Sequence, residues 1–242
     1  MRRSAIVWRA GVVALGVASL APIANWIPRG REYPAYRQEV GGWLTGLLIV
    51  VGGAVLLTIL GRRVFVSGPN GFIGRRLVNA LDQAGAEVTV LSRTRPGADV
   101  TRAGTVRTIV GDLSNAALLE AGLQGQDIVF NLAYDGRATA AANLAAFDAV
   151  LAASEKAGVG RIVHTSSIVV YDGWPNGNID ETGSMERPGG SGYRQAKIEM
   201  EHRLMAGQIP AAILQPTIVY GPGSALWTEQ FLDWLSVGDV VL

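Results

Sequence analysis

The chain has 242 residues, with 21 lysines and arginines against 20 aspartates and glutamates, two histidines and no cysteine. The lack of cysteine excludes disulfides and thiolate chemistry, and the two histidines, far apart in sequence, predict no metal centre. A net charge near zero gives no electrostatic reason to expect a nucleic-acid partner. Charged residues make up 17% of the chain, below the roughly 25% of soluble domains, and their scarcity near the N-terminus suggests contact with a membrane.

Two uncharged apolar runs dominate the N-terminal part, Ala10–Ile27 and Trp43–Leu60. As a helix, each run would be roughly 27 Å long, close to the thickness of a bilayer core. Trp26 and Trp43 stand at run ends, where tryptophan favours the membrane interface. Residues 1–61 are therefore predicted to form a membrane anchor with one or two transmembrane helices.

Other interpretations of the first run stay open. Arg2 and Arg3 could begin a signal peptide, or the run could be a buried globular helix, since Pro22 and Asn25 interrupt it. The second run has no polar face to meet water, which favours a membrane span.

Arginine clusters before the first run and after the second would lie on the same side of a two-helix hairpin. These residues are Arg2, Arg3, Arg9, Arg62 and Arg63. The positive-inside rule then predicts an integral membrane protein whose nucleotide-binding domain faces the cytoplasm, although the connecting loop also holds three arginines.

From residue 62 to 223, short β-rich runs alternate with helical stretches, which predicts a doubly wound parallel α/β sheet. The predicted strands are Val64–Ser67, Glu87–Leu91, Val106–Val110, Asp127–Leu132, Arg161–Ser166 and Ala211–Gln215. The predicted helices are Phe72–Ala84, Asn115–Ala121, Arg137–Ala157 and Tyr193–Ala206. Gly85 and Gly158 stand where helices commonly end on a glycine.

A glycine-rich loop joins the first predicted strand to the first helix. It reads Gly68-Pro-Asn70-Gly71-Phe72-Ile73-Gly74. Gly68 allows a tight turn, Gly71 allows close approach of a pyrophosphate, and Gly74 allows the helix to pack near the sheet. The helix N-terminus would supply amides to the anion, so the loop predicts a dinucleotide site.

The second strand is followed by Ser92 and Arg93, where an NAD-preferring fold usually has an acidic residue. A guanidinium can pair with a 2′-phosphate. We therefore expect NADP to be preferred, with NAD possible; the alternative is that Arg93 is a solvated loop charge.

Two further motifs carry hydroxyl groups and a lysine, namely Thr165-Ser166-Ser167-Ile-Val-Val-Tyr171 and Tyr193-Arg-Gln-Ala-Lys197. Residues four apart share a helix face, and an ammonium near a phenol lowers the pKa of the phenol. Tyr193 could then exchange a proton with a substrate oxygen that a serine holds.

Together these motifs resemble the short-chain dehydrogenase/reductase superfamily, and within it the NAD-dependent epimerase/dehydratase family. The resemblance covers about residues 63–223 and includes further matching segments. These are Gly111-Asp112-Leu113, Asn131-Leu-Ala133 and Pro216-Thr-Ile-Val-Tyr-Gly-Pro222.

The resemblance implies roles for matching positions. Ser167 would orient the reacting oxygen, Tyr193 would transfer its proton, and Lys197 would bind the nicotinamide ribose and lower the tyrosine pKa. Asn143 matches the family's structural or proton-relay asparagine. The remaining cofactor contacts would come from Asp112 and Leu113, Asn131 and Ala133, and Pro216 and Thr217, whereas Ser166 is expected to be an ordinary strand-end hydroxyl.

The chain also departs from the family. Gln215 replaces an arginine that often precedes the proline, and Tyr134-Asp-Gly-Arg137 replaces small residues. Only residues 224–242, with a short helix expected at Trp227–Leu235, stand where the family has a substrate-binding portion. That portion is therefore expected to be incomplete. Because so few residues separate Leu60 from Gly68, the domain is expected to lie against the bilayer, with the membrane or a neighbour completing its pocket.

Two functions remain open at this point. The first is a membrane-anchored oxidoreductase, epimerase or dehydratase that acts on a carbinol or carbonyl carbon of a lipidic alcohol, a ketone or a nucleotide sugar. The second is a non-catalytic accessory subunit of a membrane complex. A homodimer through the alanine-rich run Ala138–Ala157 is a further possibility, although an internal core face explains that run equally well.

Overall fold

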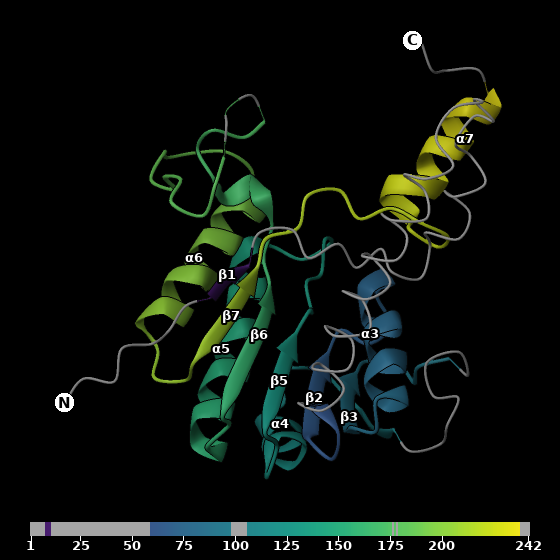
Figure 1. The fold of residues 1–242 in the computed structure, drawn as a ribbon, viewed down its shortest axis with the longest axis vertical. Coiled ribbons are helices and arrows are strands. Elements are labelled where there is room, and N and C mark those ends of the chain that lie inside the picture. Colours follow the sequence, from purple (N-terminus) through teal and green to yellow (C-terminus); the bar gives the residue numbers. More distant parts are fainter. Residues whose placement is uncertain (1–7, 11–58, 98–105, 176, 178, 238–242) are drawn as a thin grey trace, which may run out of the picture.

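The computed structural model describes residues 8–10, 59–97, 106–175, 177 and 179–237. Their centre is a parallel sheet with the strand order β1-β7-β6-β5-β2-β3-β4 (Figure 1). The edge strand β1 has three residues, Trp8–Ala10, and pairs in parallel with β7. Nothing in the sequence predicts this strand, because three residues are too few to display an alternating pattern.

The other six strands confirm the predicted doubly wound sheet. They are β2 (Arg63–Ser67), β3 (Glu87–Ser92), β4 (Arg107–Val110), β5 (Ile128–Asn131), β6 (Arg161–Thr165) and β7 (Ala211–Leu214). The strand order reverses between β2 and β5, which are directly paired. Ligands of such sheets bind outside the carboxyl ends of the strands at this reversal.

Four helices connect the strands close to their predicted bounds. They are α3 (Phe72–Gln83), α4 (Ala116–Leu123), α5 (Ala140–Ala157) and α6 (Gly192–Ala206). Gly85 and Gly158 both have positive φ, +78° and +68°, and Gly158 ends α5 in the left-handed conformation. A glycine adopts this conformation without a Cβ penalty, as predicted for both positions.

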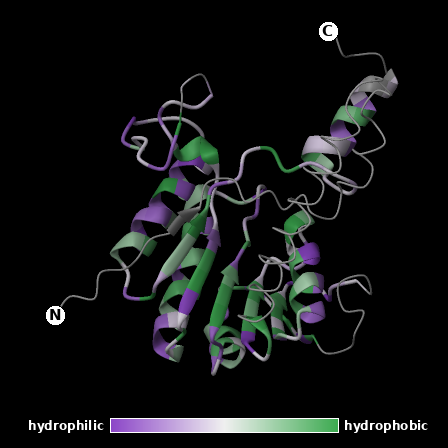
Figure 2. Cartoon of the chain, viewed as in Figure 1, coloured by the Kyte–Doolittle hydropathy of each residue, from purple (hydrophilic) through white to green (hydrophobic). Residues whose placement is uncertain are grey.

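The hydrophobic core has two parts because alternate strand residues face opposite sides of the sheet. On one side, Val64 and Val66 pack with Val78 and Leu81 of α3. On the other, Phe65 belongs to a cluster that includes residues of α4, α5 and α6. In Figure 2 the central strands are largely hydrophobic, and polar colour lies mainly on the helices and loops around them.

After β7 the chain turns away from the sheet into η2 (Ala225–Glu229) and α7 (Gln230–Val237). Figure 1 places α7 beyond the carboxyl ends of the strands, above α3. Arg75 and Arg76 of α3 donate hydrogen bonds to the carbonyls of Gly223 and Pro222 and so tie this segment down. The aromatic rings of Trp227, Phe231 and Trp234 contact one another in sequence but are each about two-fifths exposed.

None of the helices within the described residues combines the length and the apolar character that a membrane span requires. Both apolar runs lie almost entirely outside the described residues, so the predicted hairpin stays a prediction. The described end of the second run does have a place in the fold. The Gly61 amide donates to the Gly85 carbonyl, 2.9 Å away, just before β2 begins at Arg63. The junction therefore lies at the amino ends of the strands.

In the connection between β2 and α3, Gly68 and Gly74 lie too close to neighbouring backbone atoms to carry a side chain. A Cβ added to Gly74 would lie 2.0 Å from the Gly68 carbonyl oxygen, and one added to Gly68 would lie 2.9 Å from the Ala133 amide nitrogen. These glycines are demanded by the packing of the protein itself.

We therefore expect Gly74→Ala to reduce the free energy of unfolding by about 1–3 kcal/mol, the usual cost of an overpacked site, as measured by urea unfolding. Gly71→Ala is the matched control. Gly71 has φ −69° and its added Cβ would meet only one oxygen, at an ordinary 3.5 Å. The control should stay within about 1 kcal/mol of the parent. Equal stability of the two variants would contradict the packing account.

Candidate cofactor and proton-transfer site

The loop 68–71 leaves a place for an anion above the first turn of α3. Gly71 is the N-cap of this helix, its backbone is extended, and no side chain caps the helix amides. The first turn also carries no acidic residue. Free amides at a helix N-terminus favour a phosphate. A Cβ added to Gly71 would meet only the Gly68 carbonyl oxygen, at 3.5 Å, so the packing of the protein does not require glycine there. A glycine at this position would instead allow a pyrophosphate to approach the backbone, and the loop residues therefore suit a dinucleotide.

Asn70 ties the glycine loop to the loop after β3. Its Nδ2 donates to Ser92 Oγ over 2.9 Å and to Thr94 Oγ1 over 3.0 Å. Two predicted cofactor residues, Asn70 and Ser92, are thus brought together. Phe72 and Ile73 follow as half-buried residues of the first helical turn.

Arg93 reaches across to the loop after β5. Its guanidinium lies 2.9 Å from Asp135 Oδ2. The pKa of Asp112 is lowered, mainly by the hydrogen bond from the Ser114 amide and to a smaller extent by the charge of Arg93. Asp112 accepts that amide at 2.9 Å and is exposed, whereas Leu113 packs against the core.

Asn131, at the end of β5, is a buried support beneath the loops. Its Oδ1 accepts from Ser67 Oγ at 2.6 Å, and its Nδ2 lies 3.1 Å from His164 Nδ1. Because an amide nitrogen only donates, we assign the His164 proton to Nε2. Burial, followed by the charge of Lys197, holds the pKa of His164 well below its usual value, so the ring is neutral. Ala133 is fixed beside Gly68 because its amide donates to Ser67 Oγ.

The structure brings Ser167, Tyr193 and Lys197 together at the carboxyl end of β6. Ser167 precedes the short helical turn η1 (Ile168–Val170), and its hydroxyl is near enough to influence the pKa of the Tyr193 phenol, which lies in the first turn of α6. Lys197 follows one turn later, and its Nζ lies 5.8 Å from the centre of the Tyr193 ring. The lysine is 3% exposed, and its Nζ donates to the Thr165 carbonyl over 2.7 Å.

The electrostatics of this group differ from the prediction. Burial lowers the pKa of Lys197 to about 8, and the charge of Glu201 only partly opposes this. The pKa of Tyr193 is raised above its usual value, chiefly by burial, although the hydrogen bond with Ser167 lowers it in part. The expectation that Lys197 lowers the tyrosine pKa does not hold here. Desolvation disfavours the phenolate, and Lys197 instead donates to a backbone carbonyl.

Tyr134 contributes to the site and is not predicted as a site residue by the motifs. Its ring meets the Tyr193 ring edge-on, with centres 4.8 Å apart, and Lys197 Nζ lies 5.1 Å from its centre. The departure from small residues at this position is the only signal in the sequence.

Asn143 serves the backbone rather than a proton relay. Its Oδ1 accepts from the Asp135 amide, and its Nδ2 donates to the carbonyls of Asp135 and Thr139. Of the two roles that the resemblance implies, this geometry fits the structural one, which holds the loop between β5 and α5.

A buried polar network explains Gln215. Its Nε2 lies within 3.0 Å of both carboxylate oxygens of Glu201, and its Oε1 accepts from the Tyr171 hydroxyl at 2.6 Å. Ser166 also donates to Glu201, which agrees with the expected non-catalytic role of Ser166. The network joins the ends of β6 and β7 to the middle of α6.

The last predicted cofactor residues follow β7. The Pro216 carbonyl accepts from the Ile168 amide at 3.1 Å and so holds the turn after Ser167. Thr217 is exposed at the same edge of the sheet.

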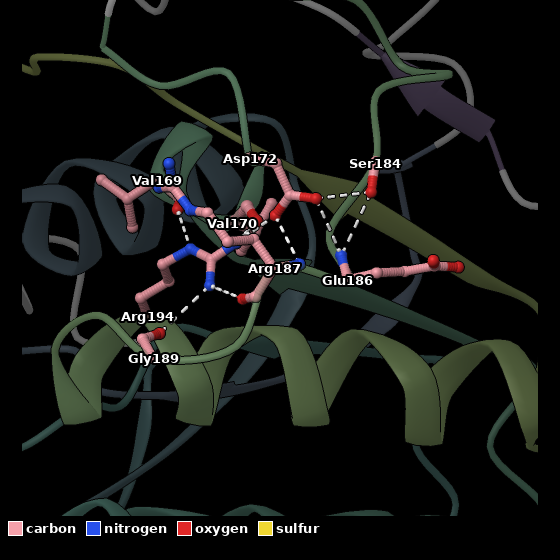
Figure 3. Close-up of polar contacts among 8 residues, drawn as sticks. All are labelled: Val169, Val170, Asp172, Ser184, Glu186, Arg187, Gly189 and Arg194. Carbon is pink, nitrogen blue, oxygen red and sulfur yellow. Dashed lines mark hydrogen bonds and ion pairs between the residues drawn. The ribbon is translucent and has the colours of Figure 1, made fainter.

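Arg194 fixes the start of α6 against the loops around it (Figure 3). Its guanidinium donates to the carbonyls of Val169, Val170, Arg187 and Gly189, and to Asp172 Oδ1 at 2.6 Å. Asp172 in turn accepts from the amides of Glu186 and Arg187. Because Arg194 directly follows Tyr193, this network determines where Tyr193 lies relative to Ser167.

We expect Arg194→Met to lower the free energy of unfolding by about 3–5 kcal/mol in urea, since it leaves buried carbonyls and Asp172 without their partner. Arg203→Met is the control, because Arg203 bridges Asp148 and Glu199 on the surface. Such pairs contribute about 0–1 kcal/mol. A loss at Arg194 no larger than that at Arg203 would show that the network does not hold α6.

The comparisons with known proteins agree with this arrangement. The family model of the NAD dependent epimerase/dehydratase family matches residues 64–240. A 4-hydroxy-2-methyl-3-oxo-4-farnesyl-3,4-dihydroquinoline-1-oxide ketoreductase from Stigmatella aurantiaca is 30% identical over 71% of this chain and 54% of its own length. A ceramide reductase from Caulobacter vibrioides is 29% identical over 66% of this chain and 47% of its own length.

Among solved structures, DesIV from Streptomyces venezuelae, a dTDP-glucose 4,6-dehydratase double mutant with NAD and DAU bound, superposes with a TM-score of 0.62. It is 26% identical over 73% of this chain and 62% of its own. The chain spans about half the length of the two curated relatives. The chain belongs to the NAD dependent epimerase/dehydratase family.

Proposed function

We propose that the chain is an NAD(P)-dependent oxidoreductase that acts on a carbinol or carbonyl carbon, with NADP preferred. The observation that carries this proposal is the grouping of Ser167, Tyr193 and Lys197 at the carboxyl edge of the sheet, the same edge at which α3 begins with its uncapped N-terminus. The loop 68–74, Ser92 and Thr217 would contribute to holding the dinucleotide.

When bound, the nicotinamide cofactor would supply or accept the hydride. The chain's own groups would handle the proton. Tyr193 would donate its phenolic proton to the substrate oxygen during reduction, or receive one during oxidation, while Ser167 holds that oxygen by a hydrogen bond. A raised pKa keeps Tyr193 protonated at neutral pH, which suits the acid role. Lys197, whose Nζ lies 5.8 Å from the centre of the Tyr193 ring, would bind the nicotinamide ribose.

The curated relatives favour a lipidic ketone or alcohol as the substrate, since one is named for a farnesylated quinoline oxide and another for ceramide. The dehydratase DesIV supports nucleotide sugars as a second class. Net hydride transfer, epimerisation and dehydration all begin with the chemistry described above.

The membrane anchor expected within residues 1–61, with the domain on the cytoplasmic side, remains part of this proposal for the two apolar runs, although Trp8–Ala10 belong to the sheet. The junction at Gly61 and the site lie at opposite ends of β2, which is roughly 15 Å for five residues.

We expect Tyr193→Phe to lose turnover by about 10²–10⁴-fold, as removal of a general acid does. The assay would follow nicotinamide absorbance with long-chain 3-oxoacyl and prenylated ketones. Binding of NADPH and NADH, followed by nicotinamide fluorescence, should remain within about twofold of the parent.

If Tyr193→Phe folds and binds the cofactor as the parent does, its loss of turnover reflects a chemical role of the phenol. Absence of NADPH and NADH binding by the parent chain would overturn the enzyme proposal and favour an accessory subunit. Full turnover by Tyr193→Phe would remove Tyr193 from the chemistry.

A further inference from the structure

The ion pair between Arg93 and Asp135 joins two loops that flank the glycine-rich loop. Arg93 follows β3 and Asp135 lies in the segment after β5, and the sheet order places β2 between those strands. Asn70, within the glycine loop, is hydrogen-bonded to Ser92 and Thr94, the two neighbours of Arg93. The chain around Arg93 is thus fixed beside the carboxyl end of β2, where a dinucleotide of this fold lies.

The two partners differ in how firmly they are held. The Asp135 amide donates to Asn143 Oδ1 over 2.8 Å, its carbonyl accepts from Asn143 Nδ2, and its Oδ1 accepts from the Arg137 amide over 2.9 Å. The Arg137 amide, followed by Arg93, keeps the pKa of Asp135 below its usual value. Asp135 is therefore a fixed anion. The Arg93 side chain is 68% exposed and has a long, flexible stem that can turn to another anion.

We propose that Asp135 determines the nicotinamide cofactor preference by competing with the 2′-phosphate of NADP for Arg93. The inference rests on the proposed function, namely that the chain binds a nicotinamide dinucleotide. One guanidinium faces two anions. The phosphate offers a bidentate partner, but taking it requires Arg93 to leave Asp135. NAD carries no such phosphate and leaves the ion pair intact.

The competition predicts weaker discrimination between the two cofactors than Arg93 alone would give. Asp112 acts in the same direction, since its carboxylate lies close enough to Arg93 to feel its charge and would repel an incoming phosphate.

The test is a pair of fluorescence titrations of the full chain with NADPH and NADH, in the parent and in Asp135→Asn. The asparagine keeps the Oδ1 that accepts from Arg137, so the loop retains its turn, but its Nδ2 cannot accept from Arg93. We expect NADPH affinity relative to NADH to rise by up to about fivefold, the largest contribution usual for an exposed ion pair, because Arg93 is released to the 2′-phosphate.

Two further variants make the result specific. In an Arg93→Met background, Asp135→Asn should no longer change the ratio, because interacting partners are not additive. Asp127→Asn is the matched control. Asp127 pairs with Arg63 at 3.4 Å, at the amino end of the sheet, and its replacement should leave the ratio unchanged.

An unchanged ratio in Asp135→Asn, or a change that persists without Arg93, overturns the inference while leaving the proposed function standing. If the parent binds neither dinucleotide, the proposed function fails and the inference fails with it. The two failures are therefore distinguishable from the parent titration alone.

Discussion

The parallel pairing of the seven described strands is the constraint from which the arrangement of the site follows. Because all the strands run in the same direction, their carboxyl ends meet at one edge, and residues scattered from Gly68 to Thr217 gather there. The strands are buried from both sides by separate clusters, which prevents a shift of register that would turn each side chain to the opposite face. The site is thus a consequence of the sheet.

A second requirement is that the loops at this edge hold still. The close contact between the backbones of Gly68 and Gly74 fixes the position of the first turn of α3. The hydrogen bonds of Arg194 fix the first turn of α6. Asn143 fixes the loop that carries Tyr134 and Asp135, through hydrogen bonds to the backbone of Asp135. Most polar side chains at the site therefore position backbone, and Tyr193 is partly exposed above them.

The fold from residue 63 onward could be predicted from the sequence because its signals are local. The β-rich runs, the glycines that end helices and the spacing of Tyr193 and Lys197 each depend on a few neighbouring residues. The gathering of Ser167, Tyr193 and Lys197 follows from those elements once the sheet is parallel. The membrane anchor stays a prediction, since its residues lie almost wholly outside those described.

The interactions that could not be predicted depend on side chains that meet from distant loops. Asp135 and Arg93 are far apart in sequence, and no sequence motif predicts that they form an ion pair. The raised pKa of Tyr193 likewise depends on the partial burial of its phenol among side chains from other elements, which spacing does not reveal. Gln215, although visible as a departure from the family, acquires its role only beside Glu201 and Tyr171.

Under the proposed function, the dinucleotide binds at the carboxyl edge of the sheet between β5, β2 and β3. Hydrogen–deuterium exchange of the full chain, with and without saturating NADPH, tests this placement. We expect slower exchange in residues 68–75, 92–95 and 131–135, and unchanged exchange near Gly61 and Gly85 at the amino ends of the strands. Protection confined to the amino ends, or to segments away from these three loops, would contradict it.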